Sequence, residues 1–304
     1  MIQKRVLRLK DSGDDVYFIQ HRLKDIGLFR DNISGYYGQS TLMSVSNFQK
    51  KSRLKITGEV NIQTWSELTK VKNIDIDKNR LIIKTNNNLE IFALDEKVDY
   101  YEDESLKRNI VISNSGVGYN PKEVVNFWKP IYNNSKKLLK SSHFLIGREN
   151  SEIKDHDGIV FRAFDDKYWS YSFLSDKLTD VISIDICNLG PLVLIDGNFY
   201  NLMGCLVSSD EVLELDFLGY NYYHRYTDNQ LESLKKLLKY LQSKHGIQIN
   251  RSSYTEDGII PYYDNDWFSN INLENNGIKT RNNYTNSLFG LTPQKEVVDM
   301  LNSI

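Results

Sequence analysis

The stretch Ser34-Gly35-Tyr36-Tyr37-Gly38-Gln39-Ser40-Thr41 is echoed by Thr57-Gly58-Glu59-Val60-Asn61-Ile62-Gln63-Thr64, 23 positions later in the chain. In both copies a glycine stands six residues before a threonine. Each glycine falls where the chain reverses before a helix, a place that favours positive φ. One such unit cannot bury its own apolar face. The two half-repeats are therefore predicted to pack together.

Helical periodicity surrounds the two half-repeats. Apolar residues recur at helical spacing in three stretches, 16–26, 42–49 and 61–68. Ser12 is the expected N-cap of the first helix and Asn61 that of the third. The sequence therefore predicts a small all-α domain of three helices at the beginning of the chain.

The positions that carry a family resemblance are spread along residues 6–68. They are Leu9-x-x-Ser12-Gly13-x-x-Val16-x-x-x-Gln20-x-x-Leu23-x-x-x-Gly27, Gly35-x-Tyr37-Gly38-x-x-Thr41, Phe48-Gln49, Leu54-x-x-x-Gly58 and Thr64-Trp65-x-x-Leu68. This pattern closely resembles the peptidoglycan-binding domain of bacterial and phage wall hydrolases, a three-helix module. The resemblance implies peptidoglycan or its fragments as the ligand, with Gly35, Tyr37 and Trp65 as candidate binding residues. A module used only for protein docking is the alternative.

Two positions depart from the family pattern. The Asp that usually precedes each repeat glycine is Ser34 in one copy and Thr57 in the other. Both residues can make local side-chain turns, so the chain reversal is expected to survive. Any contact that the Asp carboxylates make to a ligand would be lost.

Composition excludes several classes of function. The chain has 304 residues, 40% of them hydrophobic, and a net charge of −2, which argues against a mainly electrostatic nucleic-acid binder. No stretch approaches the roughly 18 apolar residues of a membrane helix. Residues 1–10 lack the apolar core of a signal peptide. No nucleic-acid or membrane partner is therefore expected.

Cysteine usage excludes a disulfide framework, because Cys187 and Cys205 are the only two cysteines. One bridge is open to them if they lie on neighbouring strands. Two buried free thiols are the expectation.

The rest of the chain changes character. Residues 69–80 are polar and fit a linker, and 81–93 suggest a β-hairpin that precedes the main domain. Strands and helices then alternate, which predicts an α/β domain with a mixed central sheet flanked by helices. The expected domain limits are 1–72, 73–108 and 109–304. The expected strands are 110–112, 143–146 and 182–187, and helices are expected to begin at Asn120-Pro121, at Thr227-Asp228-Asn229-Gln230 and at Thr292-Pro293.

A second resemblance runs from about residue 109 to the end. Its carriers are Ser142-His143-Phe144-Leu145-Ile146-Gly147, Asp157-Gly158-x-Val160, Tyr168-Trp169-Ser170-Tyr171, Ser183-Ile184-Asp185-Ile186-Cys187-Asn188-x-Gly190, Tyr226-Thr227-Asp228-x-Gln230 and Gly277-Ile278-x-Thr280. Their order resembles the N-acetylmuramoyl-L-alanine amidase family, which includes peptidoglycan-recognition proteins. Active members hold zinc with two His and a third ligand, Asp or Cys, and leave one position for water.

The positions that the resemblance assigns to the zinc ligands carry other residues. They are Ser113, Arg281 and Gly290, and the position of an assisting lysine is Leu288. Zinc takes imidazole, thiolate or carboxylate donors, so no zinc or other cofactor is expected. Arg281 would place a fixed positive charge where the zinc would be, and it could grip a carboxylate but could not generate hydroxide.

Other chemistry remains open but lacks a motif. His143, His156 and His224 could meet in space, although no ligand spacing supports a relocated metal site. No Gly-x-Ser-x-Gly elbow is present, and a carboxylate pair among the 40 acidic residues is not excluded. Asp185 takes the place of an acidic residue that is frequent on the family's central strand, with a structural carboxylate as its alternative role. The candidate ligand-binding residues of this domain are Asn114, Trp169, Asp185, Asn188 and Arg281.

Together these features predict a non-catalytic peptidoglycan-binding or structural protein with a zinc-free pseudo-amidase domain. A bacteriophage virion or a contractile injection particle, assembled in the host cytoplasm and acting at the cell wall, is the expected setting. Other structural proteins of that particle are the expected partners. The alternative is an active peptidoglycan hydrolase, such as an endolysin or amidase, with rearranged catalytic residues.

Overall fold

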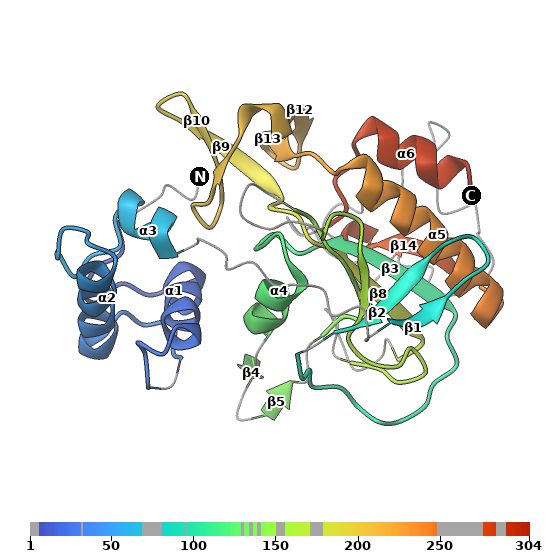
Figure 1. Ribbon diagram of the computed structural model, residues 1–304, viewed down its shortest axis with the longest axis horizontal. Helices are drawn as coiled ribbons and strands as arrows, with labels where there is room; N and C mark the ends of the chain where they lie inside the picture. Colours follow the sequence, from blue (N-terminus) through green and yellow to red (C-terminus); the bar gives the residue numbers. More distant parts are fainter. Residues whose placement is uncertain are drawn as a thin grey trace. The chain divides into compact units, whose positions relative to one another are not determined.

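The computed structural model describes residues 6–31, 33–68, 81–94, 96–128, 131–133, 136–138, 141–149, 156–170, 179–247, 276–283 and 290–304. The chain divides into two compact units (Figure 1). The first comprises Met1–Lys72 and Leu192–Glu211, and the second comprises Asn73–Pro191 and Val212–Ile304. None of the helices in the described part of the chain has the length and apolar character that a bilayer crossing requires.

The first unit contains the three helices that the periodicity predicts: α1 (Asp14–Asp25), α2 (Gln39–Lys51) and α3 (Ile62–Leu68). Asn61 caps α3 as expected, because its Oδ1 accepts the Thr64 N–H at 2.9 Å. The expected cap of α1 is wrong. Gly13 holds the N-cap position without a side-chain bond, and Ser12 instead forms a β-bridge with Tyr36.

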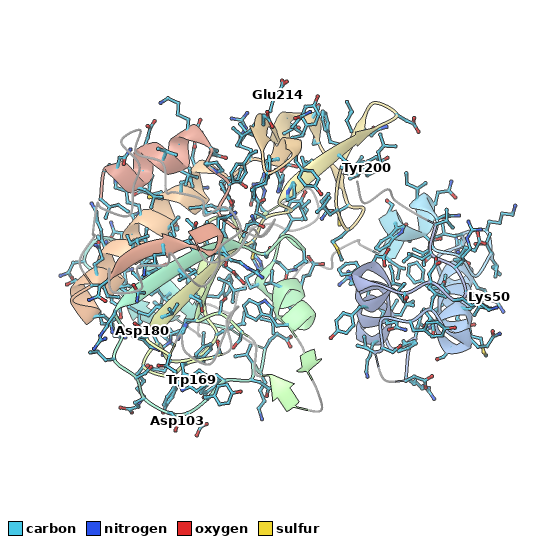
Figure 2. The ribbon with its side chains drawn as sticks, turned by 180° about the vertical axis from the view of Figure 1, so that it is seen from behind. Lys50, Asp103, Trp169, Asp180, Tyr200 and Glu214 are labelled. Atoms are coloured by element: carbon cyan, nitrogen blue, oxygen red, sulfur yellow. The ribbon has the colours of Figure 1, made fainter. Side chains whose placement is uncertain are left out.

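The later segment of the first unit is a small antiparallel meander. Strand β9 (Pro191–Ile195) pairs with β10 (Asn198–Asn201), which pairs with β11 (Leu206–Val207) and is followed by the short 3-10 helix η2 (Ser209–Glu211). Tyr200 on β10 is labelled in Figure 2. Cys205 lies just before β11, and both cysteines are free thiols, with Cys187 buried and Cys205 half-buried.

The second unit is built on a mixed sheet, as the sequence predicts. In the described residues its seven strands follow the order β1-β2-β7-β6-β8-β3-β14. β2 and β7 are parallel, as are β6, β8, β3 and β14, whereas β1/β2 and β6/β7 are antiparallel. The bounds are β1 (Leu81–Lys84), β2 (Glu90–Ala93), β3 (Asn109–Asn114), β6 (Phe144–Ile146), β7 (Val160–Arg162), β8 (Val181–Ile186) and β14 (Gly277–Thr280). The predicted hairpin, β1 with β2, is thus part of the central sheet.

Other elements of the second unit are short or lie against the sheet. They are α4 (Pro121–Trp128), the hairpin β4 (Ile131–Asn133) with β5 (Lys136–Leu138), the hairpin β12 (Val212–Phe217) with β13 (Tyr220–His224), α5 (Asp228–His245), the 3-10 helix η4 (Arg281–Asn283) and α6 (Lys295–Asn302).

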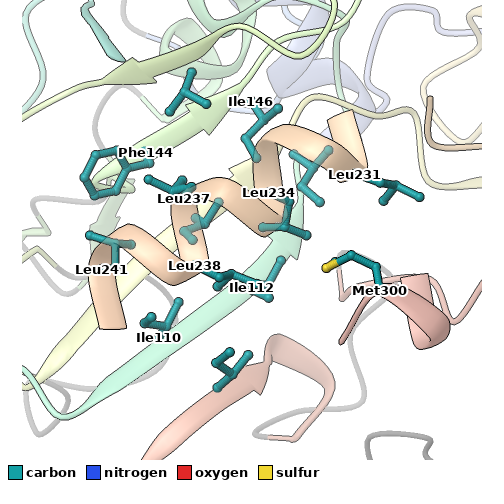
Figure 3. Close-up of a cluster of buried hydrophobic side chains, with 14 of the residues drawn as sticks. Ile110, Ile112, Phe144, Ile146, Leu231, Leu234, Leu237, Leu238, Leu241 and Met300 are labelled. Carbon is teal, nitrogen blue, oxygen red and sulfur yellow. The ribbon is translucent and has the colours of Figure 1, made fainter. Parts of the chain in front are cut away.

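In β3 and β8, successive side chains alternate between an apolar face of the sheet and a face that carries polar residues. Ile110 and Ile112 of β3 lie with Phe144 and Ile146 of β6 in one cluster with the leucines of α5, as Figure 3 shows. Because successive side chains of a strand point to opposite faces, the other residues of β3 and β8 lie on the second face. Those residues include Asn109, Ser113, Ser183 and Asp185, all of them buried, and Lys279 of β14 lies in register beside them.

Helix boundaries in this unit test two predicted starts. Thr227 and Gln230 form the predicted capping box, and Gly246 ends α5 with a left-handed φ of 65°. The predicted start of α6 at Thr292-Pro293 is wrong, because α6 begins at Lys295 with Gln294 as its N-cap. The segment before it is held by other bonds. The Thr292 N–H donates to the Tyr226 hydroxyl at 3.2 Å, and Gln294 accepts the Tyr226 N–H at 3.0 Å.

Candidate functional site

The three positions that the resemblance assigns to zinc ligands lie together at one edge of the central sheet. Ser113 is near the carboxyl end of β3, and Arg281 directly follows β14, its parallel neighbour. Gly290 forms an isolated β-bridge with Ser113. Carboxyl ends of parallel strands are where ligands bind in open α/β sheets, so this edge is the candidate site.

Ser113 forms a hydrogen bond with a neighbouring carboxylate. It pairs in register with Asp185 of β8, and its hydroxyl donates a hydrogen bond to Asp185 Oδ1. Both residues are buried, at 0% and 2% exposure. A buried carboxylate needs hydrogen bonds and a nearby cation to offset its lost hydration.

Arg281 supplies that cation. Burial lowers the pKa of its guanidinium to about 10, and the negative charge of Asp185 opposes that effect. The side chain therefore stays cationic at neutral pH. The positive charge of Arg281 therefore offsets the negative charge of Asp185 at this edge.

Because Gly290 has no side chain, the amide of Asn282 occupies the space beside it. A Cβ added at Gly290 would stand 1.1 Å from Asn282 Oδ1 and 1.9 Å from its Cγ. Asn282 is 2% exposed, so its amide has little space to move. A Cys or Asp ligand at position 290 would therefore collide with Asn282 in this arrangement.

These residues do not fit a zinc ion. A serine hydroxyl bonded to a carboxylate, a guanidinium and a glycine supply no imidazole or thiolate donor. Within the residues that the structure describes, no three His, Cys, Asp or Glu side chains are grouped so as to hold a metal. Leu288, the expected place of the assisting lysine, lies outside the described residues.

Two further candidates lie at the same edge. Asn114 ends β3, and its Nδ2 donates to the Gly290 carbonyl, while its buried Oδ1 has no hydrogen-bond partner among the described residues. Asn188 follows β8, and its amide serves the backbone: Nδ2 donates to His224 O at 3.1 Å and Oδ1 accepts from Gly190 N at 2.8 Å. Asn114 thus remains a candidate for a ligand contact, whereas Asn188 holds a loop.

Trp169 is not brought to this edge. Trp169, labelled in Figure 2, stacks on Tyr101 with ring centroids 4.1 Å apart, and the two residues form a β-bridge. The carbonyl of the preceding Tyr168 lies 3.0 Å from Nε2 of His143, which directly precedes β6. Trp169 therefore belongs near the amino ends of the central strands.

The histidines considered for a relocated site have other roles. The Nδ1 of His143 accepts the Ser183 N–H at 3.0 Å, and burial lowers the pKa of His143 to about 3. The Nδ1 of His224 accepts the Leu189 N–H at 3.2 Å. His156 packs against the ring of Phe161.

A buried ionic cluster lies near the amino ends of the central strands, which we call the amino edge of the sheet. The sequence did not predict this cluster. The carboxylate of Asp166 is fully buried and bonds Lys244 at 2.8 and 2.9 Å and His245 at 2.6 Å. Burial alone would raise the pKa of Asp166, but the hydrogen bonds from His245 and Lys244 outweigh it and hold that pKa well below its usual range. The available signal was the pair of basic residues in the last turn of α5, which suits a carboxylate partner.

In the first unit, Gln20 organises the first half-repeat. Its Oε1 accepts the N–H groups of Ser34 and Gly35, both at 2.9 Å. Its Nε2 donates to Tyr36 O and Thr41 Oγ1, both at 2.8 Å. The side chain thereby ties α1 to the reversal and to the first turn of α2.

Gln49 repeats that arrangement in the second half-repeat. Its Oε1 accepts from Thr57 N and Gly58 N at 2.9 Å, and its Nε2 donates to Glu59 O at 2.8 Å and Thr64 Oγ1 at 2.9 Å. The sequence echo therefore reflects one buried amide per half-repeat, each of which satisfies the same set of backbone groups.

The candidate binding residues of the first unit divide by exposure. Tyr37 is fully buried, and its hydroxyl donates to Gly58 O at 2.8 Å. Trp65 is 4% exposed and stacks on Phe18. Both side chains lie in the core of the domain, so they contribute to its packing and present little surface to a ligand. Gly35 adopts the positive φ, 70°, that its place in the reversal requires.

Comparisons with known proteins agree with this geometry in the first unit. Residues 12–68 match the family model described as "Putative peptidoglycan binding domain". The N-terminal helices form a domain of this peptidoglycan-binding type. A spore cortex-lytic enzyme of Halalkalibacterium halodurans is 33% identical over 73 residues, which cover 24% of this chain and 22% of the relative. The chain therefore spans about a fifth of the length of that curated relative.

Two solved structures are similar to parts of the chain. The crystal structure of the SleB N-terminal domain is 32% identical, covers 22% of this chain and 90% of that one, and has a TM-score of 0.21. The amidase AmiD from E. coli, in complex with anhydro-N-acetylmuramic acid-L-Ala-D-gamma-Glu-L-Lys, is 13% identical over 56% of this chain and 55% of that one, with a TM-score of 0.28. The mixed α/β fold of the second unit rests on its own sheet topology.

Proposed function

We propose that this protein is a non-catalytic peptidoglycan-binding protein, in which a wall-binding domain is joined to a zinc-free pseudo-amidase unit. The observation that carries the proposal is the content of the candidate site. Its three ligand-equivalent positions hold Ser113, Arg281 and Gly290, and Arg281 neighbours Asp185. Such a site has a cation of its own but no means to activate a water molecule as zinc does.

Support for wall binding comes from the first unit. Residues 12–68 match a family described by peptidoglycan binding, and 73 residues of the chain align with a spore cortex-lytic enzyme at 33% identity. The two Gln-centred networks keep the domain's chain reversals in place, with Ser34 and Thr57 in the positions of the usual Asp. Peptidoglycan is therefore the proposed ligand.

The finer part of the proposal is the setting. A wall-binding unit joined to a unit without a zinc-ligand set suits attachment better than lysis. We place such a chain in a phage virion or a contractile injection particle, with other structural proteins of that particle as its partners. Detection of the chain in purified particles by mass spectrometry, at a stoichiometry fixed from one particle preparation to the next, tests this setting. Its absence from washed particles would contradict it.

The main experiment separates binding from hydrolysis. Purified full-length protein is incubated with dye-labelled sacculi, with and without added zinc, and both sedimentation and dye release are measured. We expect the protein to sediment with the sacculi and to release no dye in either condition. Zinc-dependent release of muramoyl-linked peptide would refute the non-catalytic assignment.

The same assay addresses a working hydrolase with rearranged residues, which the similarity to a lytic enzyme favours. Dye release that persists in a chelator would indicate an acid pair rather than a metal. The Asp185 carboxylate is a poor member of such a pair, because it is buried and bonded to Ser113 beside Arg281.

A further inference from the structure

Tyr36 stands apart from every other aromatic side chain in the described part of the chain. Half of its surface (50%) is exposed, whereas the other aromatic side chains whose burial is described are buried or half-buried. An exposed ring leaves apolar area in water, and the other large apolar side chains that are exposed in the described residues are Leu, Ile or Met. Tyr36 is therefore a candidate for contact with a ligand that stacks on a flat aromatic ring.

The backbone that carries Tyr36 is fixed on both sides. Its N–H donates to Ser34 Oγ at 3.2 Å, and its carbonyl accepts from Gln20 Nε2 at 2.8 Å. Tyr36 also forms a β-bridge with Ser12. The ring is thus mounted on a rigid reversal rather than on a free loop, so that little backbone entropy is lost when a ligand binds.

One edge of the ring lies near a glycine. A Cβ added at Gly38 would lie 3.7 Å from both Cδ1 and Cε1 of Tyr36, so a side chain at position 38 would contact this edge of the ring. Glycine leaves that space open, and half of the Tyr36 surface is exposed. An exposed ring on a fixed backbone is the geometry that stacking on a flat ligand requires.

We propose that Tyr36 is a stacking platform for a sugar ring of the peptidoglycan glycan strand. The inference rests on the proposed wall binding and names the residue that makes it. The C–H bonds on the face of a pyranose carry partial positive charge, which matches the negative face of an aromatic ring, while the sugar hydroxyl and amide groups stay hydrated. An uncharged glycan therefore suits this ring without any charged partner.

The second half-repeat provides an internal control. Glu59 holds the position that corresponds to Tyr36, directly after the repeat glycine, and its carboxylate lies 4.0 Å from Arg8. A carboxylate has no apolar face for a sugar. The two half-repeats share one backbone arrangement, but only the first presents a ring, so one platform per domain is expected.

The test measures sedimentation of the full chain with purified sacculi over a range of sacculus concentrations. Tyr36→Ala is expected to weaken binding about tenfold, which corresponds to about 1.4 kcal/mol and is in the range of one aromatic contact. Tyr36→Trp is expected to retain binding. Met43→Ala removes an apolar side chain of the same unit that is slightly more exposed (59%), and Glu59→Ala alters the corresponding position; both are expected to bind as the unchanged protein does.

A competition arm identifies the chemistry. A soluble oligomer of N-acetylglucosamine is expected to displace the unchanged protein from sacculi and to lower its apparent affinity. If Tyr36→Ala binds like the unchanged protein, the platform is overturned while wall binding stands. If Tyr36→Ala is weakened but the oligomer does not compete, the ring contacts something other than sugar, and the proposal is overturned as well. If the unchanged protein does not sediment, wall binding itself fails and the platform with it.

Discussion

A carboxylate is buried at each of the two edges of the central sheet, and the two carboxylates have different partners. At the amino edge, Asp166 receives direct hydrogen bonds from Lys244 and His245 at the end of α5. At the carboxyl edge, Asp185 takes the Ser113 hydroxyl and lies in the electrostatic field of Arg281. The first cluster joins a helix to a loop. The second fills the place where the family resemblance would put a metal site.

The difference is that one buried carboxylate is paired by direct hydrogen bonds from basic side chains, whereas the other is bonded to a hydroxyl and lies near a guanidinium. The amino-edge cluster is a structural tie that any sheet with a helix ending beside it can use. The carboxyl-edge cluster keeps the sheet edge where ligands bind in α/β folds, yet it is satisfied from within by a guanidinium. In a fold of this kind the chemistry of a site depends on a few side chains mounted on a common scaffold.

Removing the internal cation should have the largest effect. Arg281→Met would take the guanidinium away from the buried Asp185, and breaking a buried pair by deleting one partner typically costs about 3–5 kcal/mol. We expect a loss of this order in the free energy of unfolding, measured by urea denaturation of the full chain at pH 7. The solvent-exposed Arg108 is the matched control, and Arg108→Met is expected to change stability by less than about 0.5 kcal/mol.

The double variant Arg281→Met/Asp185→Leu sharpens that result. Replacing both partners of a buried pair by apolar groups is frequently neutral, so the double variant should recover most of the loss. Equal losses in the single and double variants would mean that Arg281 acts through packing rather than charge.

The amino edge should respond next, and with a pH signature. Asp166→Asn removes the charge that Lys244 and His245 face, and we expect a loss toward the lower end of about 3–5 kcal/mol because the Lys244 side chain is 36% exposed. The folded-state pKa of Asp166 is depressed, so its contribution is present above the unfolded pKa of about 3.9 and is lost as pH falls through the folded value. In unfolding curves from pH 7 to pH 2, the stabilities of the two proteins should therefore begin to converge below about pH 4 and approach each other further as pH falls. Curves that stay parallel would contradict the assignment.

A side chain at Gly290 tests how closed the carboxyl edge is. Gly290→Ala would place its Cβ on the Asn282 amide, and overpacking of this kind typically costs about 1–3 kcal/mol. Thermal unfolding should show a lower midpoint for Gly290→Ala and a partial recovery for Gly290→Ala/Asn282→Ala, because the second change removes the obstructing amide. If Gly290→Ala alone is neutral, the edge is looser than the packing implies, and a ligand at position 290 becomes sterically feasible.

Local signals in the sequence were sufficient where the structure is local. The Thr227–Gln230 capping box, the Asn61 cap and the alternating isoleucines of β8 each lie within a few residues, and each was predicted. Ser12 and Thr292 failed as helix starts. In both places a long-range partner, Tyr36 or Tyr226, engages the backbone that the cap would have needed.

The site itself shows the limit of local reasoning. Ser113 and Asp185 are 72 positions apart, and they meet only because β3 and β8 pair in parallel in one particular register. The resemblance supplied the positions of Ser113, Arg281 and Gly290. It also singled out Asp185, but it could not supply the hydrogen bond between Ser113 and Asp185 or the Asn282 amide beside Gly290, because those contacts depend on strand order and side-chain packing.

The last prediction concerns the pH dependence of stability and rests on His143, near the amino ends of the central strands. Its ring is buried and neutral, and burial lowers its folded pKa to about 3, below the unfolded value of about 6.5. Between these values the unfolded chain binds a proton that the folded chain does not, so this histidine makes stability fall as pH falls, by up to about 1.4 kcal/mol per pH unit. His143→Gln can still donate to the Tyr168 carbonyl, and it should flatten the stability profile between about pH 6 and pH 4 even if it lowers stability at pH 7. An unchanged slope in that interval would show that the acid sensitivity comes from another group, and would leave Asp166 as the titrating group to examine at this edge.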